Sequence, residues 1–287
     1  MKTIKQILKN NGGIKRSNEI PILIAKAIKK EKEFIFTHPE YKLKISEYLK
    51  LRCFLYKLKK NYPLAYITKN KEFFNLDFYI NENVLVPRPE TEIMVEKTIK
   101  IINKKENKQK ILLVDVGTGS GCIPISILKN INKKIHTIAI DVSKKALGVV
   151  KINIKKHNAD IELNHGNLLT PIINNKILNN YTNLIITANL PYLTEKQFKN
   201  ELSIQREPKK ALIADNDGLE LYIQLLKQIQ NIQKKYKINI NFLLEIDPGQ
   251  TIKISNLIDN KFKLKIHKDL AKNSRIIQGI NIFASNH

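Results

Sequence analysis

The stretch Asn189-Leu190-Pro191-Tyr192 combines side chains that could hold a planar nitrogen group. The Asn189 amide can accept and donate hydrogen bonds, Pro191 restricts the backbone of the residue before it, and Tyr192 offers an aromatic face for stacking. The stretch follows an apolar run over 184–188. Such a run is typical of a fully buried strand. Taken alone, the stretch is equally compatible with an ordinary loop that contains a proline.

A second candidate site is the glycine-rich segment Gly117-Thr118-Gly119-Ser120-Gly121, which follows a predicted buried strand over 111–116. Glycine at alternate positions lets the backbone turn tightly and approach a ligand closely. No Gly-Lys-Ser/Thr follows, which excludes a P-loop for nucleoside triphosphates. The spacing is Gly-x-Gly-x-Gly rather than Gly-x-Gly-x-x-Gly, so it favours a ligand without a pyrophosphate, and S-adenosylmethionine fits that description. A nicotinamide cofactor and a purely structural turn stay open as alternatives.

Both candidate sites require strands that end at the same edge of one sheet. Asp141 closes the second predicted strand, where a carboxylate can hydrogen-bond ribose hydroxyls, and Asn167 ends the third. In a doubly wound sheet, ligands bind beyond the carboxyl ends of the strands, so 117–121, Asp141, Asn167 and Asn189 are expected around one crevice. The predicted strands are 111–116, 135–140, 161–167, 184–188, 240–246, 262–267 and 275–282. Strands that alternate with helices predict an α/β fold with a mainly parallel sheet and right-handed crossovers.

The first part of the chain has a different pattern. Residues 1–60 place apolar positions at helical spacing, which predicts several short helices in a small bundle. Alternation over 73–86 predicts a β-hairpin with its turn at Asn81-Glu82-Asn83. Pro87-Arg88-Pro89 then presents a guanidinium rigidly, or serves only as a linker. We therefore expect an N-terminal helical substrate-binding domain over 1–72, a hairpin and linker over 73–96, and a catalytic domain over 97–287.

Composition limits the class of protein. The chain has 287 residues, 43% of them hydrophobic, which suffices for a packed core. No apolar run reaches the roughly 20 residues of a transmembrane helix, and the amino terminus lacks the apolar segment of a secretory signal. Cys53 and Cys122 form no spaced ligand set, so neither a disulfide framework nor a zinc site is expected. We expect a soluble, cytoplasmic protein that is a monomer.

The formal net charge of +24 is compatible with a nucleic-acid partner. The lysines, however, are spread along the whole chain among many isoleucines and asparagines, as an AT-rich genome produces. Basic residues cluster only in short runs such as Lys57-Leu58-Lys59-Lys60. We interpret the charge as mainly compositional and keep nucleic acid as an alternative.

With the strand-end motif added, the sequence resembles the HemK/PrmC family, methyltransferases that modify glutamine in peptide chain release factors. The resemblance covers nearly the whole chain and is most diagnostic in Pro87-Arg88-Pro89-Glu90-Thr91-Glu92, which generic methyltransferases lack. Further matching segments are 63–67, 72–73, 114–121, 139–141, 189–192, 206–208, 211–212, Glu245, 269–270 and Arg275. The resemblance implies a Rossmann-like class I fold with a seven-stranded mixed sheet, a small N-terminal helical bundle and a β-hairpin linker.

The resemblance also implies a reaction and its residues. The methyl group of S-adenosylmethionine would pass to the side-chain nitrogen (N5) of the glutamine in the Gly-Gly-Gln motif of peptide chain release factors. Asn189 and Tyr192 are the implied catalytic residues. The implied cofactor-binding residues are Gly117, Thr118, Gly119, Ser120, Gly121, Asp141, Asn167, Leu168 and Asn189. The implied substrate-binding residues are Asn189, Leu190, Pro191, Tyr192 and Arg88, and no metal is implied.

In this mechanism, the strand-end motif acts on a poor nucleophile. An amide nitrogen has a delocalised lone pair, so acceptors at Asn189 and the Leu190 carbonyl would orient it and stabilise the positive charge that develops. Tyr192 would line the amide plane. Alignment contributes most, since orientation effects can reach roughly 7–11 kcal/mol. No side-chain base is needed before transfer, because the methylated amide loses its proton readily.

This sequence departs from the family pattern in a few places. The family has Asn-Pro-Pro-Tyr where this chain has Leu190 after the asparagine. Leucine still supplies a carbonyl, and Pro191 keeps Leu190 extended. Asn167 replaces a common aspartate, which alters the expected adenine contacts. Lys69 and Asn75 stand where glycines are common in the hairpin.

Three other functions share parts of this pattern. Adenine-N6 and cytosine-N4 DNA methyltransferases carry the same strand-end motif and act on flipped-out bases, but this chain offers no sizeable target-recognition domain. A ribosomal-protein glutamine methyltransferase would use the same chemistry. A cofactor-binding protein without catalysis is the third alternative, given Leu190 and Asn167.

Overall fold

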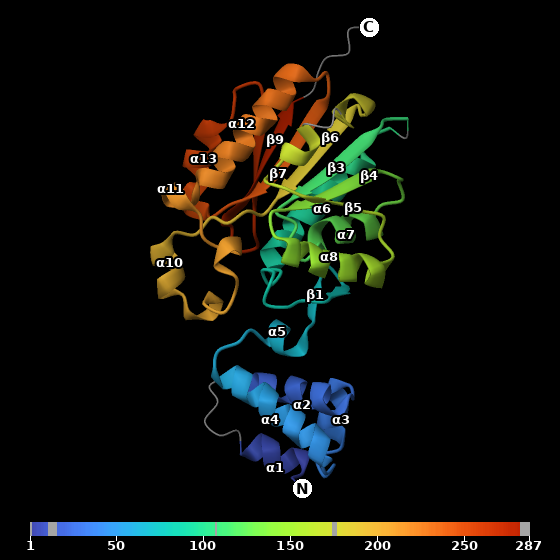
Figure 1. Cartoon of the computed structure of the whole chain (residues 1–287), viewed down its shortest axis with the longest axis vertical. Coiled ribbons are helices and arrows are strands. Elements are labelled where there is room, and N and C mark those ends of the chain that lie inside the picture. The colour runs from blue at the N-terminus through green and yellow to red at the C-terminus, as the bar shows by residue number, and fades with distance from the viewer. Residues whose placement is uncertain (1, 11–15, 107, 174–176, 282–287) are drawn as a thin grey trace. The chain divides into compact units, whose positions relative to one another are not determined.

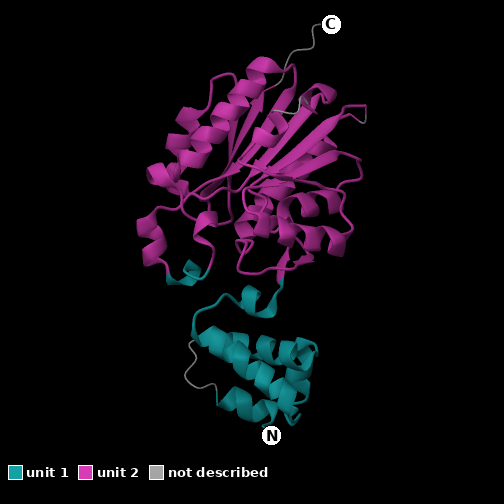
Figure 2. Cartoon of the chain, in the orientation of Figure 1, with its two compact units in different colours: residues 1–70, 202–206 teal, residues 71–201, 207–287 magenta. Residues whose placement is uncertain are grey.

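The computed structural model describes residues 2–10, 16–106, 108–173 and 177–281, which form two compact units (Figures 1 and 2). Unit 1 contains Met1–Asn70 together with Leu202–Arg206, and unit 2 contains Lys71–Glu201 with Glu207–His287. The larger unit carries the sheet, and the smaller one is helical.

Unit 1 is a small helical bundle, as the apolar spacing predicts. Its helices are α1 (Ile4–Lys9), α2 (Ile20–Ile28), α3 (Lys32–Thr37), α4 (Ile45–Lys59) and α5 (Leu64–Thr68). They enclose a core of their own that includes Leu23, Ile24 and Leu51. The segment Leu202–Arg206 joins this unit through Arg206, whose Nε donates to the Lys60 carbonyl at 3.1 Å. The Arg206 guanidinium also lies 5.0 Å from the Tyr62 ring centre.

Unit 2 is built on a seven-stranded mixed sheet in the order β5-β4-β3-β6-β7-β9-β8. Its strands are β3 (Ile111–Val116), β4 (His136–Asp141), β5 (Glu162–His165), β6 (Asn183–Ala188), β7 (Asn239–Glu245), β8 (Lys263–Lys268) and β9 (Ser274–Asn281). β9 runs antiparallel to both of its neighbours, and the five strands from β5 to β7 pair in parallel. The predicted fold class is confirmed, and the seven strands lie within about three residues of their expected bounds.

Helices cover both faces of the sheet (Figure 1). The helix α12 (Glu220–Lys235) packs Tyr222, Leu225 and Ile229 against alternate residues of the central strands, such as Val114 and Ile186. The helix α13 (Thr251–Leu257) lies beside α12. On the other face lie α6 (Glu92–Asn103), α7 (Cys122–Lys129) and α8 (Lys144–His157). Every residue of β3 and β6 is buried, as expected for strands covered on both faces.

The hairpin differs from the expectation. It is formed by β1 (Lys71–Phe73) and β2 (Leu76–Phe78), earlier than predicted. A turn does form at Asn81-Glu82-Asn83, where the Val84 backbone donates to the Asn81 carbonyl at 3.2 Å, but it joins no hairpin, and 84–86 is not a strand. The turn residues are Phe74 and Asn75, with φ of 52° and 57°. Two-residue turns of this hand match the twist of the strands, and asparagine tolerates positive φ better than most residues. Asn81 instead accepts a hydrogen bond from the Asn83 backbone at 3.0 Å inside a loop.

Several kinds of site are absent from the described residues. No helix there is long and apolar enough to cross a membrane. No group of three His, Cys, Asp or Glu side chains in the same ranges could hold a metal ion. Cys53 and Cys122 are free thiols, the first exposed and the second buried.

Candidate active site

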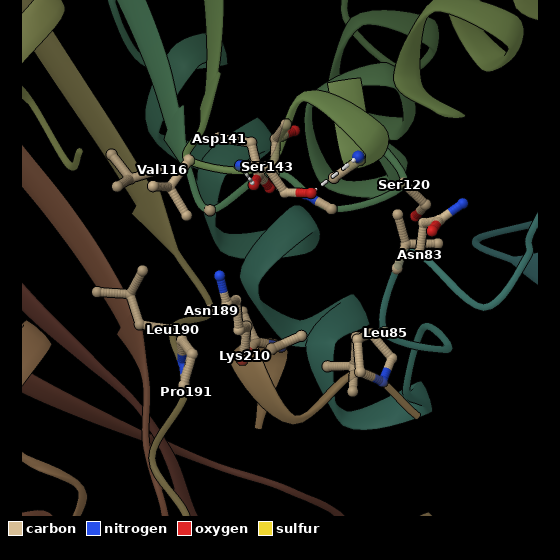
Figure 3. Close-up of a pocket in the computed structure, with 18 of the residues that line it drawn as sticks. Asn83, Leu85, Val116, Ser120, Asp141, Ser143, Asn189, Leu190, Pro191 and Lys210 are labelled. Carbon is tan, nitrogen blue, oxygen red and sulfur yellow. Dashed lines mark hydrogen bonds between the residues drawn. The ribbon is translucent and has the colours of Figure 1, made fainter. Parts of the chain in front are cut away.

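A cavity of about 420 Å³ opens at the carboxyl ends of β3, β4, β5 and β6 (Figure 3). Its volume is within the range of roughly 300–1,000 Å³ that small-molecule sites occupy. Eleven of the predicted site residues line it: Arg88, Gly117, Thr118, Gly119, Ser120, Asp141, Asn167, Leu168, Asn189, Leu190 and Pro191. Gly121 and Tyr192 do not. Segments that are far apart in sequence therefore meet at one edge of the sheet, as the strand order requires.

The glycine loop forms one wall of this cavity. The backbone N–H groups of Gly117 and Thr118 both donate to the Ile140 carbonyl, at 2.9 and 3.0 Å. Gly117 has a φ of +70°, and a Cβ there would approach Leu190 Cδ2 to 3.0 Å. Gly121 has a structural role, because a Cβ at that position would lie 2.9 Å from Val150 Cγ1. The loop thus brings bare backbone to the cavity and lets α7 pack closely.

Asp141 lies at the end of β4 with both carboxylate oxygens engaged (Figure 3). Oδ2 accepts from the Gly119 backbone at 3.0 Å, and Oδ1 accepts from the Ser143 backbone at 2.8 Å. Burial raises the pKa of this carboxyl, and the two backbone hydrogen bonds oppose the rise. A carboxylate offers about four acceptor positions, so Asp141 can still accept from a ligand. Ser143 caps α8 by accepting from the Ala146 backbone at 3.2 Å.

Asn189 follows β6 directly, at the centre of the sheet edge. The parallel register pairs Ala188 with Val116 on one side and with Leu244 on the other. This register places Asn189 next to the glycine loop and next to Glu245. Its Nδ2 donates to Thr91 Oγ1 at 3.2 Å. Within the described residues, no donor reaches the Asn189 Oδ1, so that oxygen is available to a ligand.

Glu245, at the end of β7, is a buried carboxyl behind Asn189. Burial raises its pKa to about 7, although hydrogen bonds from Thr91 and Asn189 and the charge of Arg275 lower it. Its Oε2 has no hydrogen-bond partner among the described residues. Polar groups buried in this way usually have partners, so this carboxyl is an unusual feature of the site.

A second cavity, of about 30 Å³, adjoins the strand-end motif. Tyr192 lines it together with Arg88, Asn189 and Glu245, and burial raises the pKa of the Tyr192 phenol to about 12. Arg88 is not a free cation, because its Nη2 lies 2.5 Å from Glu207 Oε1. Glu207 in turn accepts from the Val86 backbone at 3.0 Å, which fixes the loop that carries Arg88.

Leu190 keeps its side chain in the core and its carbonyl near a buried phenol. The side chain is 3% exposed and packs in the same cluster as Val116 and Tyr222. The Tyr222 hydroxyl lies 3.3 Å from the Leu190 carbonyl oxygen and also donates to the Glu245 carbonyl at a shorter distance. The hydroxyl has a single hydrogen, and the Glu245 carbonyl is its closer acceptor. The Leu190 carbonyl therefore retains the capacity to accept another hydrogen bond.

Sequence reasoning missed several residues of the site. Ser143 follows Asp141 and lines the cavity, so the strand end itself was a signal for it. Thr91 lies within the Pro-Arg-Pro-Glu-Thr-Glu stretch. That stretch indicated the family but did not mark Thr91 as a residue of the site. Asn83 comes from a loop and Lys210 from the short 3₁₀ helix η5 (Lys209–Ala211), and only the fold brings them to the cavity (Figure 3).

Comparison with known proteins agrees with this arrangement. The PrmC N-terminal domain model matches residues 1–68, and the methyltransferase small domain model matches residues 94–206. A release factor glutamine methyltransferase of Enterococcus faecalis is 36% identical over 83% of this chain and 83% of that protein. The one of Mycoplasma mycoides is also 36% identical, over 84% of each chain.

The chain belongs to the release factor glutamine methyltransferase family. The expected resemblance is thereby confirmed, and the chain is an enzyme of the methyltransferase class. Among solved structures, the hMettl16 catalytic domain in complex with the MAT2A 3′UTR hairpin 1 has a TM-score of 0.59 at 14% identity, covering 91% of this chain and 92% of that one. At 14% identity, this similarity shows that the release factor glutamine methyltransferase family member and the hMettl16 domain share a fold.

Proposed function

We propose that this enzyme transfers a methyl group from S-adenosylmethionine to the N5 nitrogen of the glutamine in the Gly-Gly-Gln motif of peptide chain release factors. The observation that supports this most is the Asn189 amide at the cavity wall, with Nδ2 bound to Thr91 and Oδ1 available. We also propose that residues 1–72 form the substrate-binding domain, that residues 73–96 form a hairpin and linker, and that residues 97–287 form the domain that carries out the transfer.

The residues of the larger cavity fit this cofactor. The glycine loop leaves room that a Cβ would fill, and Asp141 keeps acceptor positions for ribose hydroxyls. Asn167 and Leu168 line the same cavity after β5, where they would face the adenine. When bound, the cofactor supplies a methyl group already activated on a sulfonium.

The chain's own contribution is to orient the acceptor amide. Asn189 Oδ1 and the Leu190 carbonyl would accept its two N–H hydrogens, and Tyr192 would restrict its plane. As the nitrogen attacks, it gains positive charge, and two acceptors fixed in advance stabilise that charge without reorganisation.

The test is transfer of a labelled methyl group to intact release factor by purified enzyme. Replacement N189A should lower kcat on the order of 10²–10³-fold, as loss of one preorganised hydrogen-bonding group does. Cofactor affinity should change far less, because the glycine loop and Asp141 remain. N130A is a matched control, since Asn130 only caps the end of α7 through the Ser126 carbonyl.

Label on DNA or on a ribosomal protein, with release factor untouched, would assign a different substrate. A release factor whose Gly-Gly-Gln glutamine is replaced by glutamate should accept no label. Unchanged turnover of N189A would refute the proposed role of this residue.

A further inference from the structure

The three side chains Thr91, Asn189 and Glu245 come from three separate segments and meet behind the larger cavity. Thr91 belongs to the turn before α6 and is 2% exposed, and Glu245 ends β7 and is also 2% exposed. Asn189 Nδ2 donates to Thr91 Oγ1 at 3.2 Å, and both side chains lower the pKa of the Glu245 carboxyl, which lines the smaller cavity together with Asn189. Thr91 and Asn189 line the larger cavity, whereas Glu245 does not.

The chemistry of these groups gives the chain of hydrogen bonds a direction. An ionised carboxylate only accepts, so the Thr91 hydroxyl, which lowers the pKa of Glu245, turns its single hydrogen toward that carboxylate. The Thr91 oxygen can then only accept, and the group that donates to it is the Asn189 Nδ2. The opposite end of the amide, Oδ1, is thereby turned away from Thr91 and Glu245. The buried pair thus determines which end of the Asn189 amide is free.

We propose that Thr91 and Glu245 are positioning residues that hold Asn189 with its Oδ1 toward the amide to be methylated. This inference rests on the proposed function, because it concerns the same acceptor amide. An asparagine turned by 180° would present Nδ2, a donor, to the substrate N–H groups and could not accept from them. Neither Thr91 nor Glu245 needs to touch substrate for this role.

The direction of the hydrogen bonds depends on the charge of Glu245. Once protonated, the carboxyl can donate to Thr91, whose hydroxyl is then free to donate to Asn189 Oδ1 and to favour the wrong orientation. The titratable and charged groups that act on Glu245 from the surrounding elements are Glu90, Cys122, Tyr192, Tyr222 and Arg275. Burial raises the pKa of Cys122 and Tyr192 to about 12 and that of Tyr222 well above its ordinary value, so these three stay neutral near pH 7. Transfer should therefore decline as the pH falls below about 7.

The test compares kcat for release factor in T91V, T91S and E245Q. T91V keeps the shape and removes the hydroxyl, so kcat should fall at least tenfold while the cofactor Kd and the KM for release factor change less than threefold. T91S restores the hydroxyl and should stay within threefold of the wild type. E245Q removes the titrating carboxyl and should lose the acidic decline of kcat. T98V is the matched control, since Thr98 is a buried threonine of α6 that donates to the Met94 carbonyl.

Three results would overturn the proposal: T91V within twofold of the wild type, T91S as impaired as T91V, or E245Q with the wild-type pH profile. If the wild type itself leaves release factor unlabelled, the proposed function has failed, and NMR decides the positioning separately. In protein with ¹⁵N-labelled asparagine, the Asn189 side-chain signals are assigned from N189A. A cross-peak from these NH₂ hydrogens to the Thr91 methyl group, lost in T91V but not in T98V, is expected. Its absence in the wild type would contradict the proposed orientation.

Discussion

Asn189 illustrates how much a single residue depends on groups that no local motif contains. Its position at the end of an apolar run made Asn189 predictable. Gly117 and Asp141 were predictable from their own positions at strand ends. The partners of its amide were not predictable in the same way. Thr91 lies 98 residues earlier in the chain, and Glu245 lies 56 residues later. Only the strand order brings Glu245 beside Asn189, and only the packing of the turn before α6 adds Thr91.

Asp141 offers a test of the cofactor site at the same scale. In D141N, one side-chain oxygen becomes an NH₂ group facing a backbone N–H, and the negative charge is lost. Hydrogen bonds to charged groups contribute about 1.5–3 kcal/mol, so the Kd for S-adenosylhomocysteine should rise about 10- to 100-fold. Isothermal titration calorimetry measures this change. D160N, at an exposed loop position, should bind as the wild type does, and equal affinity of D141N would remove Asp141 from the site.

At the scale of elements, burial explains which predictions succeeded. The strands that form the centre of the sheet are predominantly apolar, so their bounds follow from the sequence to within a few residues. The hairpin turn was placed wrongly because Phe74 and Asn75 adopt positive φ without a glycine to indicate it. Tertiary packing helps to hold this turn, since the Phe74 backbone N–H donates to Glu92 Oε1 at 2.9 Å.

Two glycines provide opposite tests of element packing. A Cβ on Gly279 of β9 would lie 2.1 Å from Phe242 Cζ, whereas one on Gly148 of α8 would meet nothing within 4 Å. G279A should therefore lower the free energy of unfolding by about 1–3 kcal/mol through overpacking. G148A should raise it by about 0.5–1 kcal/mol, since alanine favours a helix interior. Urea denaturation measures both, and a neutral G279A would contradict the close contact between β9 and β7.

At the scale of the whole molecule, buried carboxyls link stability to pH. Asp115 in β3 is fully buried, and its Oδ1 accepts from Thr187 Oγ1 at 2.6 Å. Burial raises its pKa from 3.8 to about 7. Between these values the folded state binds a proton that the unfolded state has lost, so the free energy of unfolding decreases as the pH rises.

D115N removes this titration while keeping the shape of the side chain. As the pH rises from 4 to 8, the free energy of unfolding of the variant should increase relative to that of the wild type by up to about 4 kcal/mol. Each unit of difference between the folded and unfolded pKa corresponds to about 1.4 kcal/mol. Other titrating groups cancel in the comparison. Urea denaturation at both pH values measures the difference, and a stability difference that does not change with pH would contradict a raised pKa for Asp115.

The composition of unit 1 has a consequence for the order in which the protein is made. Its bundle includes Leu202–Arg206, a segment that leaves the ribosome only after β3, β4, β5 and β6. Synthesis normally allows an N-terminal domain to finish folding first. Here the first helices emerge early, yet the contacts of Arg206 with Lys60 and Tyr62 cannot form until most of the sheet has been translated. The unit that begins the chain can therefore be completed only after much of unit 2 has been made.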